Sequence, residues 1–170
     1  VYGAVTNAGG GIAISSVPNH GTSVRLYIPA HKRISRETAI LAMKPDAGAG
    51  KTLLLVDDED LVLAVGRTIL TASGYKVLTA QSGEKALEIL ADHKDEVDLV
   101  IVDWVMPRFS GQQLMEAIRA EYPSIAVLCT SGYAHVPGTS ETDFLQKPFT
   151  TQKLLERVKG KLSAVAAVAA

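Results

Sequence analysis

From residue 52 onward the sequence alternates between short apolar runs and amphipathic stretches, and this alternation restricts the fold more than any other feature. The apolar runs are rich in β-branched residues and bounded by polar residues, glycine or proline, which is typical of strands buried on both faces. They predict strands at 53–56, 75–80, 98–103, 125–129 and 144–146. The amphipathic stretches predict helices over 61–72, 82–93, 110–121 and from 152 into an alanine-rich end.

Short connections between alternating strands and helices produce parallel strands with right-handed crossovers, so that helices cover both faces of the sheet. The sequence therefore predicts an α/β fold, namely a flavodoxin-like, doubly wound, five-stranded parallel sheet with the strand order 2-1-3-4-5. We place this domain at residues 52–165 and an alanine-rich tail at 166–170. A short β-rich segment with a predicted hairpin occupies residues 1–31, and residues 32–51 have the composition of a linker.

The composition excludes several classes of protein. With 170 residues, 47% of them hydrophobic and 21% charged, the chain can hold one globular domain and a smaller segment. A net charge of −1 gives no general attraction to nucleic acid or to an anionic membrane, and no apolar run reaches the roughly 18 residues of a membrane helix. The single cysteine, Cys129, excludes an internal disulfide and a cysteine-based zinc site, and its apolar neighbours favour a buried hydrophobe.

Polar side chains follow four of the five predicted strands. Because the carboxyl ends of neighbouring parallel strands meet at one edge of the sheet, we expect these side chains to lie together: Asp57, Asp58, Asp103, Thr130 and Lys147. Three carboxylates in one cleft repel one another unless a divalent cation lies among them, and ligands that are all oxygen favour magnesium over zinc. With an ammonium and a hydroxyl beside the same carboxylates, the set predicts phosphoryl transfer to an aspartate.

Four motifs surround these residues, in the order in which they occur along the chain: Leu53-Leu-Leu-Val-Asp57-Asp58-Glu59, Leu99-Val-Ile-Val-Asp103-Trp-Val-Met-Pro107, Val127-Leu-Cys-Thr130-Ser131-Gly132 and Phe144-Leu-Gln-Lys147-Pro148-Phe149. Together they resemble the receiver domain of response regulators, over residues 52 to about 165. The resemblance implies a phosphorelay function, in which a histidine kinase or a histidine phosphotransfer protein donates a phosphoryl group in the presence of Mg²⁺.

The resemblance also implies a role for each acidic residue. Asp103 would be the phosphoacceptor, Asp58 a direct ligand of Mg²⁺, and Asp57 a part of the acidic pocket. The backbone carbonyl of Val105 would complete the protein's share of the metal coordination.

The remaining roles fall on the later strands. Thr130 would hydrogen-bond the incoming phosphoryl group, and Lys147 would pair with its oxygens. Phe144 occupies the position of the family's aromatic switch residue, which acts together with Thr130. A plain core position is an equally good reading of Phe144, because an apolar ring carries no hydroxyl that would indicate a solvent-facing state.

The first 31 residues carry a second resemblance. Val1-Tyr-Gly-Ala-Val, Gly9-Gly-Gly-Ile and Gly21-Thr-Ser-Val-Arg-Leu-Tyr-Ile-Pro29 resemble the end of the ATP-binding domain of sensor histidine kinases. The motifs that hold Mg-ATP in that domain do not occur in this sequence, so we expect no ATP binding and no independent enzyme from these residues. The whole then resembles the C-terminal end of a hybrid sensor histidine kinase, cytoplasmic in location, with a homodimer left open.

Several of these motifs, in both parts of the chain, also allow other interpretations. Gly9-Gly-Gly11 lacks the following Lys-Ser/Thr and the spacing of a phosphate-binding loop. A two-stranded hairpin is marginal by itself, so residues 1–31 are expected to be disordered or to pack against a partner. The acidic pair could favour a helix N-terminus only, and a pseudo-receiver would bind partners without being phosphorylated. A phosphatase of the haloacid dehalogenase type needs a second acid two residues after the nucleophile, where this chain has Val105.

Two departures from the receiver pattern affect function. The segment between Thr130 and Lys147 is shorter than the family's usual length and contains Pro137 and Gly138, so a regular helix is not expected there. This change puts the family's usual output surface in doubt. Val105 and Gly132 flank the site without polar side chains, from which we expect slow hydrolysis of the aspartyl phosphate.

Overall fold

The computed structural model describes residues 5–6, 9–29, 50–133 and 140–168. The chain divides into two compact units, Val1–Leu41 and Ala42–Ala170, which we describe separately. The predicted linker at residues 32–51 lies almost entirely outside the described residues, as does a short helix that the sequence would allow over residues 36–43.

The first unit contains an antiparallel hairpin of two seven-residue strands, β1 (Gly11–Val17) and β2 (Gly21–Tyr27). The turn between them uses the left-handed backbone region at Asn19 (φ 62°) and Gly21 (φ 93°), which confirms the predicted hairpin. Cross-strand pairs such as Ile14 with Val24 lie on one face. That face is exposed in the isolated chain. Residues 11–27 thus form the hairpin, and the expectation that residues 1–31 are disordered or pack against a partner stays a prediction.

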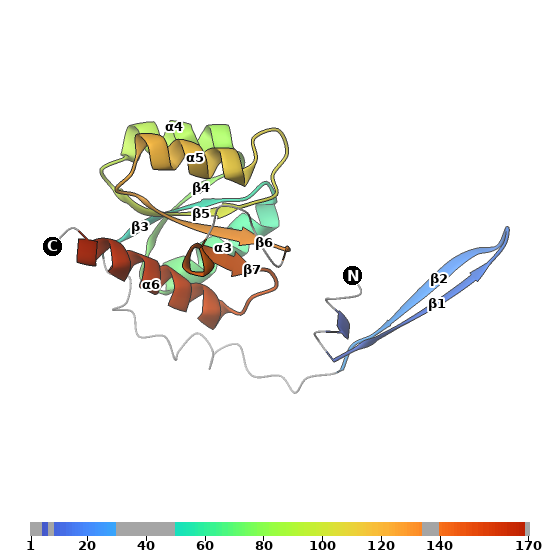
Figure 1. Cartoon of the computed structure of the whole chain (residues 1–170). Helices are drawn as coiled ribbons and strands as arrows, with labels where there is room; N and C mark the ends of the chain where they lie inside the picture. Colours follow the sequence, from blue (N-terminus) through green and yellow to red (C-terminus); the bar gives the residue numbers. More distant parts are fainter. Residues whose placement is uncertain (1–4, 7–8, 30–49, 134–139, 169–170) are drawn as a thin grey trace. The chain divides into compact units, whose positions relative to one another are not determined.

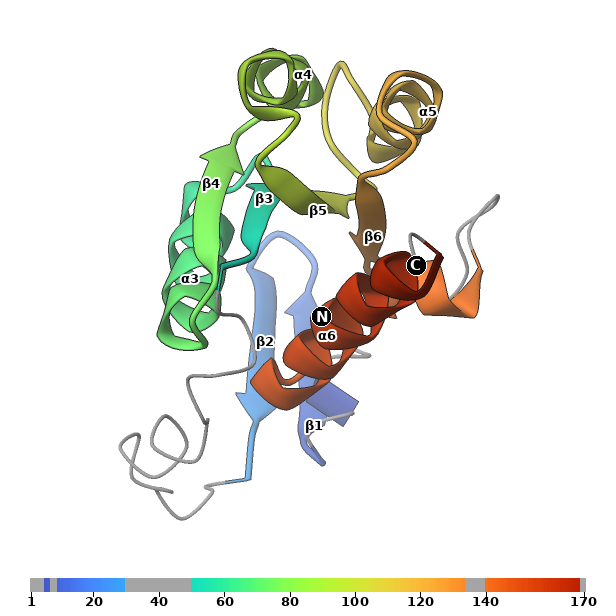
Figure 2. The ribbon, with the colours of Figure 1, turned by 90° about the vertical axis from the view of Figure 1, so that its left-hand side faces the viewer.

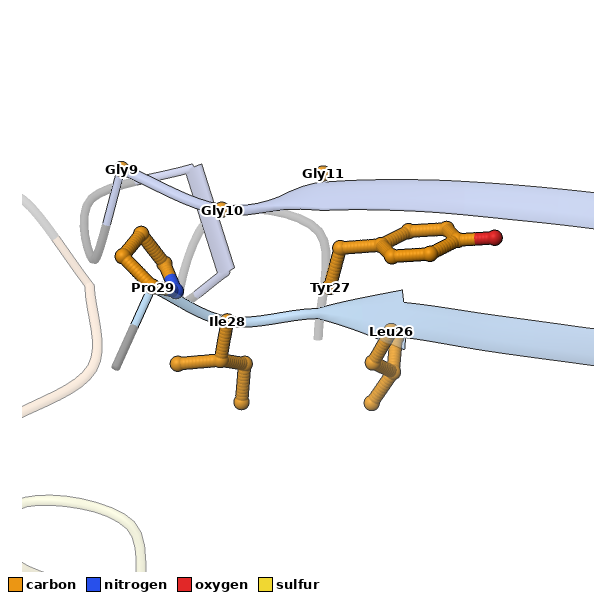
Figure 3. Close-up of a pocket in the computed structure, with 7 residues that line it drawn as sticks. All are labelled: Gly9, Gly10, Gly11, Leu26, Tyr27, Ile28 and Pro29. Atoms are coloured by element: carbon orange, nitrogen blue, oxygen red, sulfur yellow. The ribbon is translucent and has the colours of Figure 1, made fainter.

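The glycine-rich stretch lies at the open end of this hairpin. Figure 3 shows Gly9, Gly10 and Gly11 opposite Tyr27 and Pro29, around a shallow pocket of about 480 Å³. A Cβ atom at Gly10 would lie 2.3 Å from the carbonyl oxygen of Tyr27, so this close approach of the two strands requires glycine. The lining residues carry no charged side chain that would bind a phosphate.

The second unit is built on a five-stranded, fully parallel sheet, β4-β3-β5-β6-β7. Numbered within the domain, this is the predicted order 2-1-3-4-5. The strands are β3 (Thr52–Val56), β4 (Lys76–Ala80), β5 (Val97–Asp103), β6 (Ala126–Ser131) and β7 (Phe144–Gln146). The first four strands differ by one or two residues from their predicted bounds, and the fifth matches them.

Helices cover both faces of this sheet (Figures 1 and 2). One face packs against α4 (Gly83–His93) and α5 (Gly111–Glu121), and the other against α3 (Asp60–Ala72) and α6 (Thr151–Val168). Successive strand residues alternate between the two cores: Leu54 and Val100 contribute to the first, and Leu53 and Leu99 to the second. Both cores are apolar, which explains the continuous hydrophobic runs in the sequence.

Local sequence signals set several helix ends. Ser82 and Ser110 cap α4 and α5, and Ser110 forms a reciprocal capping box with Gln113. The last helix continues to Val168, so the first part of the predicted tail belongs to α6.

Of the shortened segment before β7, residues 134–139 lie outside the described part, and the described remainder contains a 3₁₀ turn at Glu141–Asp143. Within the described residues, no helix is both long and apolar enough to cross a bilayer.

Candidate functional site

The strand register brings the predicted site residues to one edge of the sheet. Val56 pairs with Val102, so that Asp57 and Asp103 follow neighbouring positions on β3 and β5. Asp103 in turn pairs with Thr130 on β6. Lys147 follows β7, and its backbone N–H donates to the carbonyl oxygen of Ser131 over 2.7 Å.

Three carboxylates form the centre of this site. Oxygen atoms of Asp57, Asp58 and Asp103 all lie within 4.8 Å of one another. Asp57 is 2% exposed and Asp103 is 9% exposed, whereas Asp58 is open to solvent. Such proximity of partly buried carboxylates is costly without compensating positive charge.

Lys147 supplies positive charge from the protein itself. Its Nζ atom lies 3.0 Å from Oδ2 of Asp57 and 3.3 Å from Oδ2 of Asp103. Burial by itself would lower the pKa of Lys147, but hydrogen bonding to Asp57 and attraction from Asp103 outweigh it and raise that pKa above its ordinary value. The lysine therefore stays protonated and bridges the two buried carboxylates.

For the Asp103 carboxyl group, burial outweighs the attraction of its positively charged partner, and its pKa is raised. Burial is the main cause that raises its pKa, and the negative charge of Asp57 adds to it. Lys147 and the backbone N–H of Val105, which donates a hydrogen bond to Asp103, act in the lowering direction without cancelling the rise. The positive charge of Lys147 therefore compensates the negative charge of Asp103 only in part.

The hydroxyl and the aromatic ring assigned from sequence lie on the same edge. Thr130 is 4% exposed, and among the described residues its hydroxyl makes a single hydrogen bond, a long one of 3.5 Å to the carbonyl oxygen of Val102. That weak bond leaves the hydroxyl available for another acceptor. Phe144 is half-buried and packs against the core beneath α4 and α5, as its reading as a core residue would require.

The loop from Trp104 to Ser110 closes one side of the site. The backbone N–H of Trp104 donates to the carbonyl oxygen of Thr130 over 2.8 Å. The backbone N–H of Gly111 donates to the carbonyl oxygen of Trp104 over 3.2 Å. A Cβ atom at Gly111 would lie 2.2 Å from the backbone oxygen of Asp103, so only glycine fits. Sequence reasoning did not identify Gly111, although a glycine at a helix start just after a proline-containing loop was an available signal.

The donor set fits a magnesium ion. All candidate ligand atoms are oxygens: the carboxylates of Asp57, Asp58 and Asp103, and the backbone carbonyl of Val105. Within the described residues, no histidine or cysteine belongs to this cluster. Mg²⁺ prefers oxygen ligands and usually keeps several of its water molecules when it binds a protein. A site that is open to solvent at Asp58 leaves room for those waters.

Several large apolar side chains are exposed on the segments that follow the site residues along the chain. Leu61 and Val65, one helical turn apart on α3, are 74% and 52% exposed. Val105 is 53% exposed and Tyr133 is 63% exposed, and these two residues lie on the loops that follow Asp103 and Thr130.

The family comparison decides the assignment. Residues 53–159 match the model of the response regulator receiver domain. The chain belongs to this family. Solved receiver structures agree with its fold: the receiver domain of the hybrid histidine kinase CckA is 39% identical, with a TM-score of 0.57 over 65% of this chain and 98% of that one. A receiver from Clostridium thermocellum is 27% identical, with a TM-score of 0.65 over 69% of this chain and 98% of that one.

Relatives of full length extend well beyond this receiver chain. The sensor kinase CckA of Brucella abortus is 35% identical over 176 residues, which cover 95% of this chain but 19% of that kinase. The response regulator FleR of Pseudomonas aeruginosa is 37% identical over 116 residues, covering 65% of this chain and 24% of that protein. The chain thus spans about a fifth to a quarter of these relatives.

Proposed function

We propose that this receiver accepts a phosphoryl group from a histidine phosphate onto Asp103 and signals by the resulting conformational change. The observation that carries the proposal is the bridge made by Lys147 between Asp57 and Asp103 inside the acidic cluster. A pseudo-receiver would be expected to lack one of these charged groups, and none is missing. A haloacid-dehalogenase-type phosphatase is disfavoured because Val105 stands where the second acid is needed.

The proposed transfer uses groups that are already in place. A carboxylate oxygen of Asp103 attacks phosphorus, the P–N bond to the donor imidazole breaks, and the imidazole leaves as a neutral ring with a proton on its other nitrogen. Lys147 pairs with the phosphoryl oxygens, and the hydroxyl of Thr130 donates to one of them.

Magnesium would be held by Asp58, Asp103 and the carbonyl of Val105, with Asp57 beside it, and it would neutralise phosphoryl charge. A related solved structure supports this cofactor. The response regulator TrrA of Thermotoga maritima was solved in complex with Mg²⁺–BeF and is 30% identical, with a TM-score of 0.58 over 65% of this chain and 97% of that one.

We further propose that the chain is the C-terminal part of a cytoplasmic hybrid sensor kinase. The alignment with the Brucella abortus sensor kinase covers 95% of this chain, which is more than the receiver alone occupies. In this proposal residues 1–31 end an ATP-binding domain and residues 32–51 link it to the receiver at 52–165. The exposed apolar face of the hairpin supports this proposal, because two strands that end a larger domain would bury that face against the rest of the domain.

The partner on the phosphate side is proposed to be a protein with an apolar surface around its phosphohistidine. The exposed side chains of Leu61, Val65 and Tyr133 would contact it while the acidic cluster receives the phosphoryl group. This arrangement would favour a histidine kinase or a phosphotransfer protein over a small phosphodonor.

The test uses the fluorescence of Trp104, the only tryptophan of the chain, which directly follows Asp103. Addition of Mg²⁺ to the full chain should change its emission, and addition of beryllofluoride should change it again. Asp103→Asn should abolish the second response while the circular dichroism spectrum stays unchanged. Asp95→Asn, on the exposed turn before β5, is the matched control and should respond as the wild type does. A wild-type chain without either response would contradict the proposal and favour a pseudo-receiver.

A further inference from the structure

We propose that the contact between Gly83 at the start of α4 and the ring of Phe109 positions the loop 104–110, and with it the backbone of Val105 beside Asp103. This inference rests on the proposed function, since it assigns a purpose to loop placement at the phosphoacceptor site. Gly83 and Phe109 are thereby positioning residues, which touch neither the metal nor the phosphoryl group.

The Gly83–Phe109 contact leaves no room for a side chain. A Cβ atom at Gly83 would lie 2.1 Å from Cδ1 of Phe109, and 2.9 Å from both Cγ and Cε1 of the same ring. A non-bonded contact of a Cβ atom shorter than 3.0 Å is essentially never found in proteins, so either the ring or the helix must move when Gly83 is replaced.

The helix is the better anchored of the two partners. Ser82 caps α4 by accepting a hydrogen bond from the N–H of Lys85, and Ala86 and Leu90 are fully buried against the sheet. Phe109 is half-buried, at the edge of the same core. A side chain at position 83 would therefore displace Phe109 and the loop that carries it.

Displacement of the loop reaches Asp103 because few residues separate the two. Met106 is 7% exposed and fixes the loop in the core, and the N–H of Val105 donates to the Asp103 carboxylate. The far end of the loop is closed by Gly111, which packs directly on the backbone of Asp103. Phe109 lies between Met106 and Gly111, so its contact with Gly83 determines the path of the loop between these two held positions.

The test is the substitution Gly83→Ala in the full chain, with two readouts. The first is the Mg²⁺ dissociation constant from Trp104 fluorescence, which we expect to rise on the order of tenfold, because catalytic and ligand geometries tolerate shifts of only about 1 Å. The second needs no metal: the amide resonance of Val105, in spectra recorded with a chelator, should shift in Gly83→Ala. A merely structural role would lower the melting temperature without moving either readout.

Matched glycine variants separate positioning from general damage. Gly160→Ala places a methyl group in open space on α6. Gly66→Ala crowds Leu55, with its Cβ 2.6 Å from Cδ2, in the core on the other face of the sheet. We expect both controls to keep the wild-type Mg²⁺ affinity and the wild-type Val105 resonance, although Gly66→Ala should melt at a lower temperature.

A double variant tests the contact itself. Phe109→Ala removes all three ring atoms that a Cβ at position 83 would strike, so Gly83→Ala/Phe109→Ala should bind Mg²⁺ more tightly than Gly83→Ala alone, with the Val105 resonance moved back toward its wild-type position. The inference is overturned if Gly83→Ala leaves the metal-free Val105 resonance unchanged, or if the double variant is no better than the single one. If the wild type does not bind Mg²⁺ at all, the proposed function fails, while the metal-free spectra still decide the contact.

Discussion

The Nζ atom of Lys147 lies 3.3 Å from Oδ2 of Asp103, and the same ammonium lies 3.0 Å from Oδ2 of Asp57. One cation is thus shared between two buried carboxylates, with a third, Asp58, close by. The chain folds with a local excess of negative charge at the site. This excess is a cost to the metal-free fold and an attraction for Mg²⁺ and for the developing charge of a transferred phosphoryl group.

The excess charge predicts a pH-dependent stability in the absence of metal. The pKa of Asp103 is raised above the ordinary value of 3.8, first by burial and then by Asp57, so the folded state binds this proton more tightly than the unfolded state. Ionised Asp103 therefore destabilises the fold; the cost is absent below pH 3.8 and complete above the raised pKa. Asp103→Asn should unfold at higher urea concentration than the wild type, by a margin that grows as the pH rises above this value, in buffer with a chelator. A margin independent of pH would contradict this account.

The surroundings of Asp103 also predict a long-lived aspartyl phosphate. Val105 presents an apolar side chain to solvent at 53% exposure, and Gly132 has no side chain, so neither position offers a side-chain group that could hydrogen-bond an attacking water. Val105→Asn should shorten the half-life of the phosphorylated chain, measured by loss of label after removal of the donor. Gly132→Ala, whose Cβ meets open space, adds no polar group and should leave the half-life unchanged. Rapid spontaneous loss in the wild type would count against this prediction.

The start of β3 gives a test of the fold that is independent of the site. Asp98 sits at an irregularity in the pairing of β3 with β5, and its carboxylate accepts the N–H of Thr52 over 2.9 Å and the ammonium of Lys51 over 2.7 Å. Asp98→Ala leaves the N–H of buried Thr52 without this acceptor, which should lower the free energy of unfolding by about 1–3 kcal/mol. Glu96→Ala removes an exposed ion pair with Lys76 and should change it little. Urea titrations of both variants check the difference, and equal effects would contradict it.

Much of the receiver fold could be predicted because its signals are local. Apolar runs buried on both faces identified the strands, and serine caps identified where α4 and α5 begin. The strand ends were less accurate: β6 continues to Ser131, because pairing with β7 extends the ladder beyond the apolar run. The last helix continues into the alanine-rich stretch because alanine favours helix and nothing there ends it.

In the candidate site, too, some features could be predicted from the sequence and others could not. Asp57 and Lys147 directly follow strands of one sheet, and Asp103 and Thr130 lie at the ends of two others, so their convergence followed from topology alone. The contact of Gly83 with Phe109 could not be predicted, since it joins a helix start to a distant loop and depends on how both pack. Whether Lys147 pairs with one carboxylate or two is equally a matter of side-chain placement, which no sequence spacing determines.

Cys129 gives a last prediction, because it is fully buried on β6 between the sheet and α5. Burial raises the pKa of its thiol to about 11, although Arg119 and Lys161 act in the lowering direction, and its Sγ atom lies 3.6 Å from Sδ of Met115. Only the thiolate reacts with alkylating or disulfide reagents, so at pH 8 the native chain should be modified orders of magnitude more slowly than the same chain in denaturant. A thiol titration with Ellman's reagent, with and without guanidinium chloride, measures both rates. Reaction of the native chain at the rate of the unfolded one would show that β6 and α5 separate far more readily than this packing implies, because the reagent can reach Cys129 only when that core opens.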